Sequence, residues 1–354
     1  MMLQRNLTMR NFRVASRTRL PAAGVAGIVL ALLVAGIAEP AHSQQRRQIG
    51  LYAARPGTGS YGFSLALANL VNKYSKSVTL HLRSASGASE HLRIMTQQPA
   101  ERASNLFTAE LVTVLWAQKG IEFFKEPYAG TRAISLFSNA TLVLATYDRN
   151  IKSKNDLIGK RIMAYPRFFS AGRFVEVLVN DVWKIGNRVT LSHAFPTAIA
   201  RALGDGTIDV GQVDADGMPG GPWHVGEELN QLQILKPGLY FMGFTLEDFK
   251  AAAKVLQVDL PSDVVTPGSY GPNQKDPLRG IVSALFWAAD ASMDPDVVYE
   301  IARILYEHLQ EFNQAYPSSV LNRERMGALN TTADFFHPGA ATFYKKVGVP
   351  IGLK

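Results

Sequence analysis

Short apolar runs alternate with segments of helical periodicity along most of the chain, beginning near residue 49. Apolar runs bounded by Gly, Pro or polar turns predict strands, and apolar positions spaced three or four apart predict helices. Their alternation is typical of an α/β sheet. The predicted strands cover 49–54, 78–83, 105–108, 134–137, 141–147, 161–165, 189–192, 208–213 and 232–235.

The pattern turns helical after residue 235. Asp294 precedes Pro295, which predicts a helix N-cap followed by proline at the first helical position. Gly204 is expected to end an earlier helix. The predicted helices cover 63–74, 90–97, 111–119, 172–182, 197–203, 246–257 and 295–316, with a helical turn at 156–160 and a short helix within 337–354.

The first 43 residues have a different pattern, that of a secretory signal peptide. Five arginines precede any acid, and an apolar run covers 22–38. The run is followed by Ala41-His42-Ser43, which has small residues at positions −3 and −1 of the expected cleavage site. We expect cleavage before Gln44 and export to a periplasm. The alternative is a retained transmembrane anchor, although the run is at the lower limit for spanning a bilayer.

Composition and charge narrow the possible functions. The chain has 354 residues, no cysteine and a net charge of +8. The absence of cysteine excludes disulfides, Cys-zinc sites and thiol nucleophiles. Half of the net charge belongs to the predicted signal peptide, and no Lys/Arg cluster alternates with aromatics, so nucleic-acid binding has little support. The length favours about two domains.

A glycine-rich loop follows the first predicted strand and opens a helix. Residues 57–62 read Gly-Thr-Gly-Ser-Tyr-Gly and match G-x-G-x-x-G, the dinucleotide fingerprint. The second strand ends in His81-Leu82-Arg83-Ser84, without an acid for a ribose hydroxyl, so no nucleotide cofactor is expected. A helix N-terminus still favours an anion. The loop is therefore an anion site or a plain glycine-rich turn, with the predicted contacts Thr58, Gly59, Ser60 and Tyr61.

Two further loops repeat the order of strand, small residues and helix. In residues 84–90 we expect Ser86, Gly87 and Ser89 to contact a ligand, or the hydroxyls merely to cap the helix. In residues 167–173 we expect Ser170 and Gly172 to do so. Arg173 either pairs with a carboxylate or is a solvated surface residue. Three such helix starts, drawn from two halves of the chain, predict one shared cleft beyond the carboxyl ends of the strands.

Catalytic and metal-binding patterns are weak. The sequence lacks G-x-S-x-G and H-E-x-x-H, and its histidines are widely scattered. A Ser/His/Asp site assembled from distant positions has no positive support. Asp214 lies near the end of a predicted strand, where it contacts a ligand or simply forms a turn. We expect no catalytic residues, no metal site and no cofactor.

Several segments, in order, resemble the solute receptors of tripartite (TRAP) transporters of the TAXI type, over nearly the whole chain after residue 43. The segment 151–161 is similar to the family's I-K-S-L-D-D-L-K-G-K-R run, and 202–209 to its A-L-x-D-G-x-I-D run. Two segments depart from the family pattern: 108–110, Thr-Ala-Glu, replaces Q-S-D, and 167–173 is bulkier and more basic. The other similar segments are 57–59, 84–89, 296–299 and 337–340.

The resemblance implies a type II periplasmic-binding-protein fold, in which two α/β lobes close on a solute like a hinge. We expect lobe 1 to comprise 44–140 plus 240–354, and lobe 2 to comprise 141–239. The implied ligand is a small organic anion such as a dicarboxylate, an oxoacid or a glutamate-like amino acid. The implied partners are integral membrane transporter subunits, driven by an ion gradient.

The sequence therefore predicts a non-enzymatic, exported receptor for a small organic anion. Thr108 and Glu110, at a predicted strand end, join Asp214 as weaker candidate ligand contacts. Two alternatives stay open: a secreted hydrolase using the same cleft, and a receptor that serves a membrane sensor.

Overall fold

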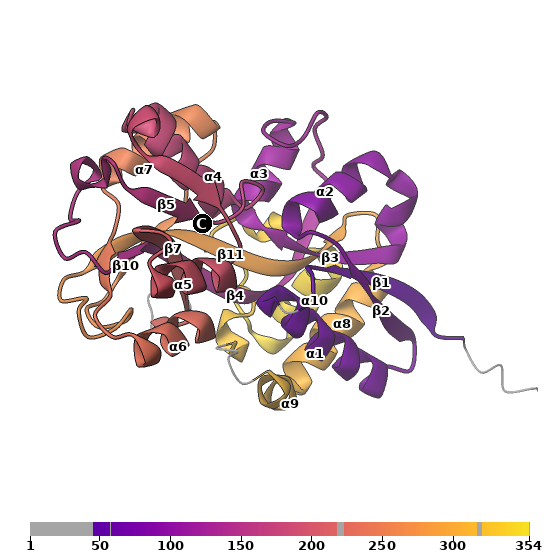
Figure 1. Cartoon of the computed structure of the whole chain (residues 1–354). Helices are drawn as coiled ribbons and strands as arrows, with labels where there is room; N and C mark the ends of the chain where they lie inside the picture. Colours follow the sequence, from indigo (N-terminus) through magenta and orange to yellow (C-terminus); the bar gives the residue numbers. More distant parts are fainter. Residues whose placement is uncertain (1–44, 57, 218–222, 317–320, 354) are drawn as a thin grey trace, which may run out of the picture. The chain divides into compact units, whose positions relative to one another are not determined.

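Two groups of parallel strands are joined by two long antiparallel strands in one sheet (Figure 1). The computed structural model describes residues 45–56, 58–217, 223–316 and 321–353. The predicted signal peptide, its cleavage site and Gly57 lie outside the described residues. Residues 46–354 form one compact unit.

The strands of the sheet include both short edge strands and two that exceed twelve residues. They are β1 (Arg47–Ala53), β2 (Val78–Ser84), β3 (Asn105–Glu110), β4 (Thr131–Thr146), β5 (Arg161–Ala164), β6 (Thr190–His193), β7 (Val210–Gly217), β8 (Trp223–Val225), β9 (Tyr240–Met242), β10 (Ser262–Val265) and β11 (Leu278–Asp290).

The α-helices lie between these strands and after the last of them. They are α1 (Gly59–Tyr74), α2 (Ala88–Gln97), α3 (Leu111–Lys119), α4 (Ser170–Val177), α5 (Pro196–Asp205), α6 (Glu227–Leu235), α7 (Leu246–Leu256), α8 (Pro295–Glu307), α9 (Leu309–Ala315) and α10 (Pro338–Val347).

The strand order is the same in both parts of the sheet. The main path runs β2-β1-β3-β11-β4-β7-β5-β6. In the first α/β half, β1 is parallel to β2 and β3; in the second, β5 is parallel to β6 and β7. The chain crosses between the halves through β4 and returns through β11. This order confirms the predicted α/β fold of the type II kind with crossover strands.

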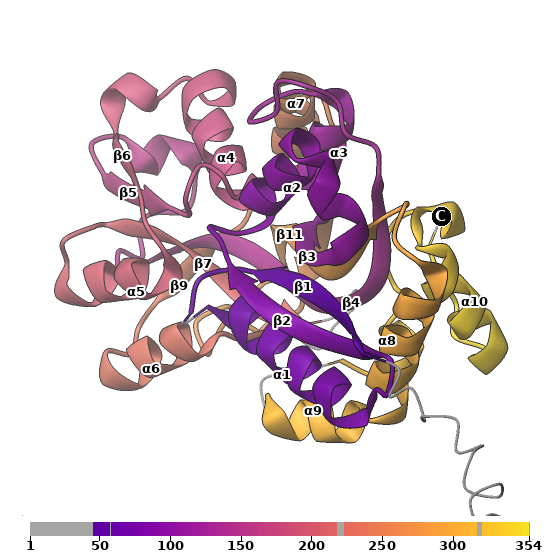
Figure 2. The same ribbon diagram turned by 90° about the vertical axis from the view of Figure 1, so that its right-hand side faces the viewer.

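Helices cover both faces of the first half. Figure 2 shows α1, α8 and α9 on one side of β1 and β2, and α2 and α3 on the other.

Among the described residues, no helix is long and apolar enough to cross a bilayer.

The crossover strands account for two corrections to the sequence prediction. Residues 134–137 and 141–147 were expected to be separate strands, but β4 is continuous. Its polar centre, Ser138 and Asn139, is buried and pairs with β11 on one side and β7 on the other, so hydrogen bonding overrides the polar interruption. The pattern after residue 235 predicts helices only, and β11 is therefore a strand that the sequence prediction does not contain.

Three helical assignments also differ. Residues 232–235, predicted as a strand, form the end of α6, so an apolar run alone misidentified them. The helix predicted at 295–316 is divided at His308 into α8 and α9. The helix expected to end at Gly204 continues to Asp205, and Gly206 ends it with φ 77°, a left-handed conformation that suits glycine.

The segment after residue 240 associates with the second half. β9 pairs with the end of β4, and β10 pairs with the start of β11. Phe249 on α7 stacks on Phe174 of α4, with ring centroids 4.8 Å apart. These contacts place β9, β10 and α7 beside β4, β11 and α4, although the expected boundary at residue 240 assigns them to lobe 1. The division into two lobes itself remains a prediction.

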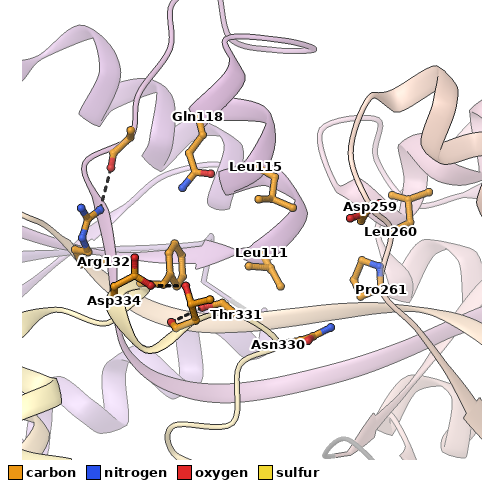
Figure 3. A pocket seen from close by; sticks show the side chains of 13 residues that line it. Leu111, Leu115, Gln118, Arg132, Asp259, Leu260, Pro261, Asn330, Thr331 and Asp334 are labelled. Carbon is orange, nitrogen blue, oxygen red and sulfur yellow. Dashed lines mark hydrogen bonds between the residues drawn. The ribbon is translucent and has the colours of Figure 1, made fainter. Parts of the chain in front are cut away.

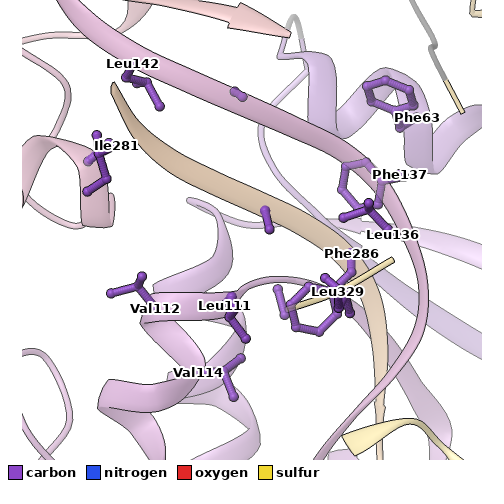
Figure 4. Packing of buried hydrophobic residues seen from close by; sticks show 14 of the residues in the cluster. Phe63, Leu111, Val112, Val114, Leu136, Phe137, Leu142, Ile281, Phe286 and Leu329 are labelled. Carbon is purple, nitrogen blue, oxygen red and sulfur yellow. The ribbon is translucent and has the colours of Figure 1, made fainter. Parts of the chain in front are cut away.

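An aromatic cluster packs α1 and α9 onto the crossover strands. Phe137 on β4 lies 4.5 Å from the Trp287 ring on β11 and 5.2 Å from the Phe63 ring on α1. Phe312 on α9 lies 5.8 Å from Trp287. Figure 4 shows Phe63 and Phe137 beside each other in this core. Because these rings bring together four elements, their burial fixes the first half to the crossover strands.

We expect Phe137→Ala to lower the free energy of unfolding by about 3–5 kcal/mol, because it removes a fully buried ring and leaves a cavity. Phe123→Ala is the matched control, since that ring is 37% exposed, and it should cost less than about 1 kcal/mol. Denaturant unfolding measures both. Equal losses in the two variants would contradict the proposed role of this cluster.

Candidate functional site

The N-terminus of α1 is built by the loop after β1. Thr58 is the N-cap, and its Oγ1 accepts a hydrogen bond from the Tyr61 N–H at 3.3 Å and donates to the Arg55 carbonyl at 2.8 Å. Ser60 Oγ donates to Thr108 Oγ1 at the end of β3 over 3.4 Å. Gly59 is exposed. Thr58 therefore has a capping role, while the strand ends β1 and β3 bring Ser60 and Thr108 together.

The N-terminus of α2 has no side-chain cap. Gly87 is the N-cap residue, with φ 126°, and an added Cβ would lie 3.3 Å from the Phe169 ring. Ser86 Oγ accepts a hydrogen bond from Arg55 at 3.4 Å, and Ser89 Oγ donates to the Phe168 carbonyl at 2.5 Å. The hydroxyls of this loop thus reach residues outside α2, including one in the second half.

The N-terminus of α4 contacts the first half through Ser170. Its Oγ donates to Glu110 Oε1 at 2.8 Å. A Cβ on Gly172 would lie 2.3 Å from the Tyr165 carbonyl oxygen, so close packing against the preceding loop accounts for this glycine. Arg173 forms ion pairs with Glu122 at 2.9 Å and Glu176 at 3.3 Å. Its guanidinium therefore links α4 to the segment after α3.

Glu110 is buried at the start of α3. It accepts hydrogen bonds from the Thr113 N–H and Oγ1, at 3.0 and 2.6 Å, besides the one from Ser170. Burial raises the pKa of this carboxyl, and the hydrogen bonds oppose that effect. Glu110 thus caps α3 and connects it to the second half.

Two carboxyls follow each other on one face of β7. Asp214 accepts a hydrogen bond from Tyr165 at 2.5 Å, and Asp216 accepts one from Ser138 on β4 at 3.3 Å. Burial and then the charge of Asp214 raise the pKa of Asp216 to about 7. Burial also raises the pKa of Asp214. Burial and mutual repulsion therefore disfavour negative charge on this pair of carboxyls.

Sequence reasoning missed Arg55 and Phe195 at this face, whereas the bulky segment 167–173 already suggested Phe168 and Phe169 as an aromatic wall. The Arg55 guanidinium lies 5.9 Å from the Phe195 ring centroid, so a residue of the β1–α1 loop meets the loop after β6. Phe168 and Phe169 are 5.1 Å apart, and each lies about 6 Å from Phe195. The available signals were an arginine between a strand end and a glycine-rich loop, and an aromatic residue, Phe195, directly before the helix α5.

The structure thus brings most predicted residues to one boundary between the halves. Direct contacts there join the tips of α2 and α4 through Ser89 and Phe168, and β3 to α4 through Glu110 and Ser170. Asp214 is reached through Tyr165, whose ring lies 6.4 Å from Phe169. Gly172 and Arg173 lie nearby but contact protein partners. Ligand contact by any of the predicted residues remains a prediction.

Within the described ranges, no group of three or more His, Asp or Glu side chains is arranged to hold a metal ion. The buried His91 is held between main-chain carbonyls, with Nδ1 2.8 Å from Thr108 O and Nε2 3.2 Å from Ala53 O. Burial lowers its pKa. His91 is thus a structural histidine, although it lies close to Thr108.

A separate cavity of about 460 Å³ lies beside α3 (Figure 3). Leu111, Leu115, Arg132 and Asp334 line it, and none of its lining residues is a predicted ligand contact. Arg132 donates to the Ala129 and Thr131 carbonyls, at 2.9 Å each, and Asp334 accepts from Thr332. Arg132 and Asp334 are thus each bonded to neighbouring protein groups, and the cavity stands apart from the boundary that the predicted ligand contacts share.

The chain belongs to the NMT1-like family, whose model matches residues 52–348. Solved structures similar to it include a TctC solute-binding protein from Polaromonas, at 14% identity and TM-score 0.46, covering 77% of this chain and 88% of that one. Another is MatC from Rhodopseudomonas palustris with bound malate, at 11% identity and TM-score 0.47, with the same coverage. A third, from Xanthomonas citri with bound ATP, has 10% identity and TM-score 0.48, covering 85% and 98%.

We expect stability to fall as the pH rises from about 4 to about 7, because Asp216 keeps its proton in the folded state at pH values where the unfolded chain has released it. Asp216→Asn should flatten this slope by on the order of 1 kcal/mol between pH 5 and 7. Denaturant unfolding at several pH values measures the effect. An unchanged slope in the variant would show that Asp216 titrates normally.

Proposed function

We propose that this chain is an exported solute receptor that captures a small organic anion at the boundary of its two α/β halves. The contacts that carry the proposal are those joining helix tips of both halves, Ser89 with Phe168 and Ser170 with Glu110. A molecule bound at this boundary touches both halves at once and stabilises one relative arrangement of them. Membership of the NMT1-like family and the resemblance to TAXI-type receptors support the same function.

Arg55 is the residue that we propose to bind the anion. It is exposed, donates weakly to Ser86 over 3.4 Å and faces the second half through Phe195. Arg173, the arginine expected from the sequence, is already paired with Glu122 and Glu176. A ligand carboxylate would have to compete with two protein carboxylates for Arg173, whereas at Arg55 it would replace one long hydrogen bond.

The chemistry of the boundary favours binding over hydrolysis. Ser60 contacts Thr108 and Ser86 contacts Arg55, and neither donates to a histidine. The histidine in this network is His91, which Thr108 Oγ1 contacts at 3.1 Å, and each of its ring nitrogens also lies within hydrogen-bond distance of a main-chain carbonyl. The organic anion, once bound, would be delivered to the membrane subunits of a tripartite transporter of the TAXI type, as the sequence resemblance implies.

A thermal-shift screen of the purified protein against organic acids tests this function. A ligand present at 100 times its Kd should stabilise the protein by about 2.7 kcal/mol and raise the Tm by several degrees. Arg55→Ala should abolish most of that rise. Arg323→Ala is the matched control, since Arg323 also lies over an aromatic ring, 4.9 Å from Tyr306.

Arg173→Ala separates the two arginines. If it abolishes the ligand-induced rise while Arg55→Ala does not, the anion binds at Arg173 and our assignment of Arg55 is wrong. If no organic anion raises the Tm of the unmutated protein, the receptor function itself is contradicted.

Export predicts a processed N-terminus. We expect the protein recovered from the periplasmic fraction to begin at Gln44, because small residues precede the predicted cleavage site. Intact mass spectrometry measures this directly. A mass that includes residues 1–43, with the protein in the membrane fraction, would instead establish a retained anchor.

A further inference from the structure

Three phenylalanine rings gather where the loops after β5 and β6 meet the first half. We call Phe168, Phe169 and Phe195 the aromatic trio. Their centroids are separated by 5.1, 6.2 and 6.0 Å, and all three side chains are half-buried. The pairs are tilted or edge-to-face, the arrangements that aromatic rings prefer. The trio thus presents partly exposed aromatic surface at the proposed site.

Two members of the trio occupy positions that normally take polar residues. Phe169 is the N-cap of α4 and Phe195 the N-cap of α5, and neither helix has a side-chain cap. Ser, Thr, Asp or Asn at such a position would stabilise the helix by about 1 kcal/mol. Departures from local preference are expected at functional sites, and here two N-caps depart from it side by side. An aromatic ligand body would match these rings.

The charges around the trio limit the ligand to one carboxylate. In the part of this face that the structure describes, Arg55 is the arginine without a carboxylate partner, whereas Arg167 and Arg173 pair with acidic residues. Arg55 lies over the Phe195 ring. On the other side, Tyr165 links Phe169 to Asp214. A second ligand carboxylate on that side would add a negative charge near Asp214, and among the described residues of this face it would meet no arginine that lacks a carboxylate partner.

We propose that the site binds an aromatic monocarboxylate, with its carboxylate on Arg55 and its ring against the aromatic trio. This inference rests on the proposed receptor function and narrows its organic anions to one class. A dicarboxylate would leave one charge unpaired near Asp214, and burying an unpaired charge is costly. An aromatic body instead adds edge-to-face contacts to the burial of apolar area.

Calorimetric titration of the purified protein with benzoate, cyclohexanecarboxylate and succinate tests the proposal. We expect benzoate to bind at least about tenfold more tightly than either of the other two, a difference of about 1.4 kcal/mol. Phe195→Ala and Phe168→Ala should each weaken benzoate binding by about tenfold, and Phe195→Tyr should largely retain it. Phe335→Ala, which removes an equally half-buried ring next to the separate cavity, is the control and should leave the affinity unchanged.

The outcomes separate this inference from the receptor function. Tighter binding of succinate would overturn the aromatic class and leave an organic-anion receptor. Equal binding of cyclohexanecarboxylate would overturn the need for an aromatic ring. Benzoate affinity that is insensitive to both Phe→Ala variants, while the Tm of each variant falls, would show that the trio packs the two halves together without touching a ligand. No heat with any organic anion would contradict the receptor function as well.

Discussion

The pairing of β4 with β11 is the constraint on which the arrangement of the site depends. These strands are antiparallel neighbours, and each joins one α/β half to the other. Most of their residues are buried, and unpaired backbone groups there would be costly, so the hydrogen-bond ladder between them is strongly favoured. Since β3 pairs with β11 and β7 pairs with β4, the ends of β3 and β7 are placed through this ladder. Glu110 and Asp214 are themselves paired in these ladders, opposite Leu285 and Leu142, so the pairing of β4 with β11 sets the positions of both residues.

The direct contacts between the halves are of a weaker kind. Hydrogen bonds such as the one from Ser170 to Glu110 contribute about 1 kcal/mol each, and a partly exposed ion pair such as that of Arg173 with Glu122 contributes less still. A ligand that touches both halves competes with energies of this size. Breaking one of these contacts therefore costs the ligand little of its binding free energy. Most of the free energy that the ligand gains from touching both halves contributes to its affinity.

Local pattern predicted the first half of the fold well and the crossover strands poorly. The segments that became β1, β2, α2, β3 and α3 have unbroken apolar periodicity, and the structure bears them out within a few residues. Ser138 and Asn139 interrupt the apolar pattern of β4, which therefore predicts two strands. The pairing of both residues with β11, and of Asn139 with β7, makes the strand continuous. β11 pairs with strands more than a hundred residues earlier in the chain, so no local window contains the reason for its conformation.

The site shows the same division between local and distant information. The small-residue loops could be located from sequence, because a strand, a glycine or serine and a helix follow one another directly. The ion pair of Arg173 with Glu122 joins residues 51 positions apart, and the approach of Arg55 to Phe195 joins residues 140 positions apart. Chain order alone does not say which arginine is left for a ligand.

The irregular register between β4 and β11 has a mechanical consequence. The pairing shifts between Leu285 and Phe286 and again between Trp287 and Ala288, and such β-bulges bend a strand and increase its twist. The ribbon that carries the chain from one half to the other is thus least regular next to the aromatic core around Trp287. The bend and the extra twist at this point therefore set the direction in which β11 runs from the second half into the aromatic core.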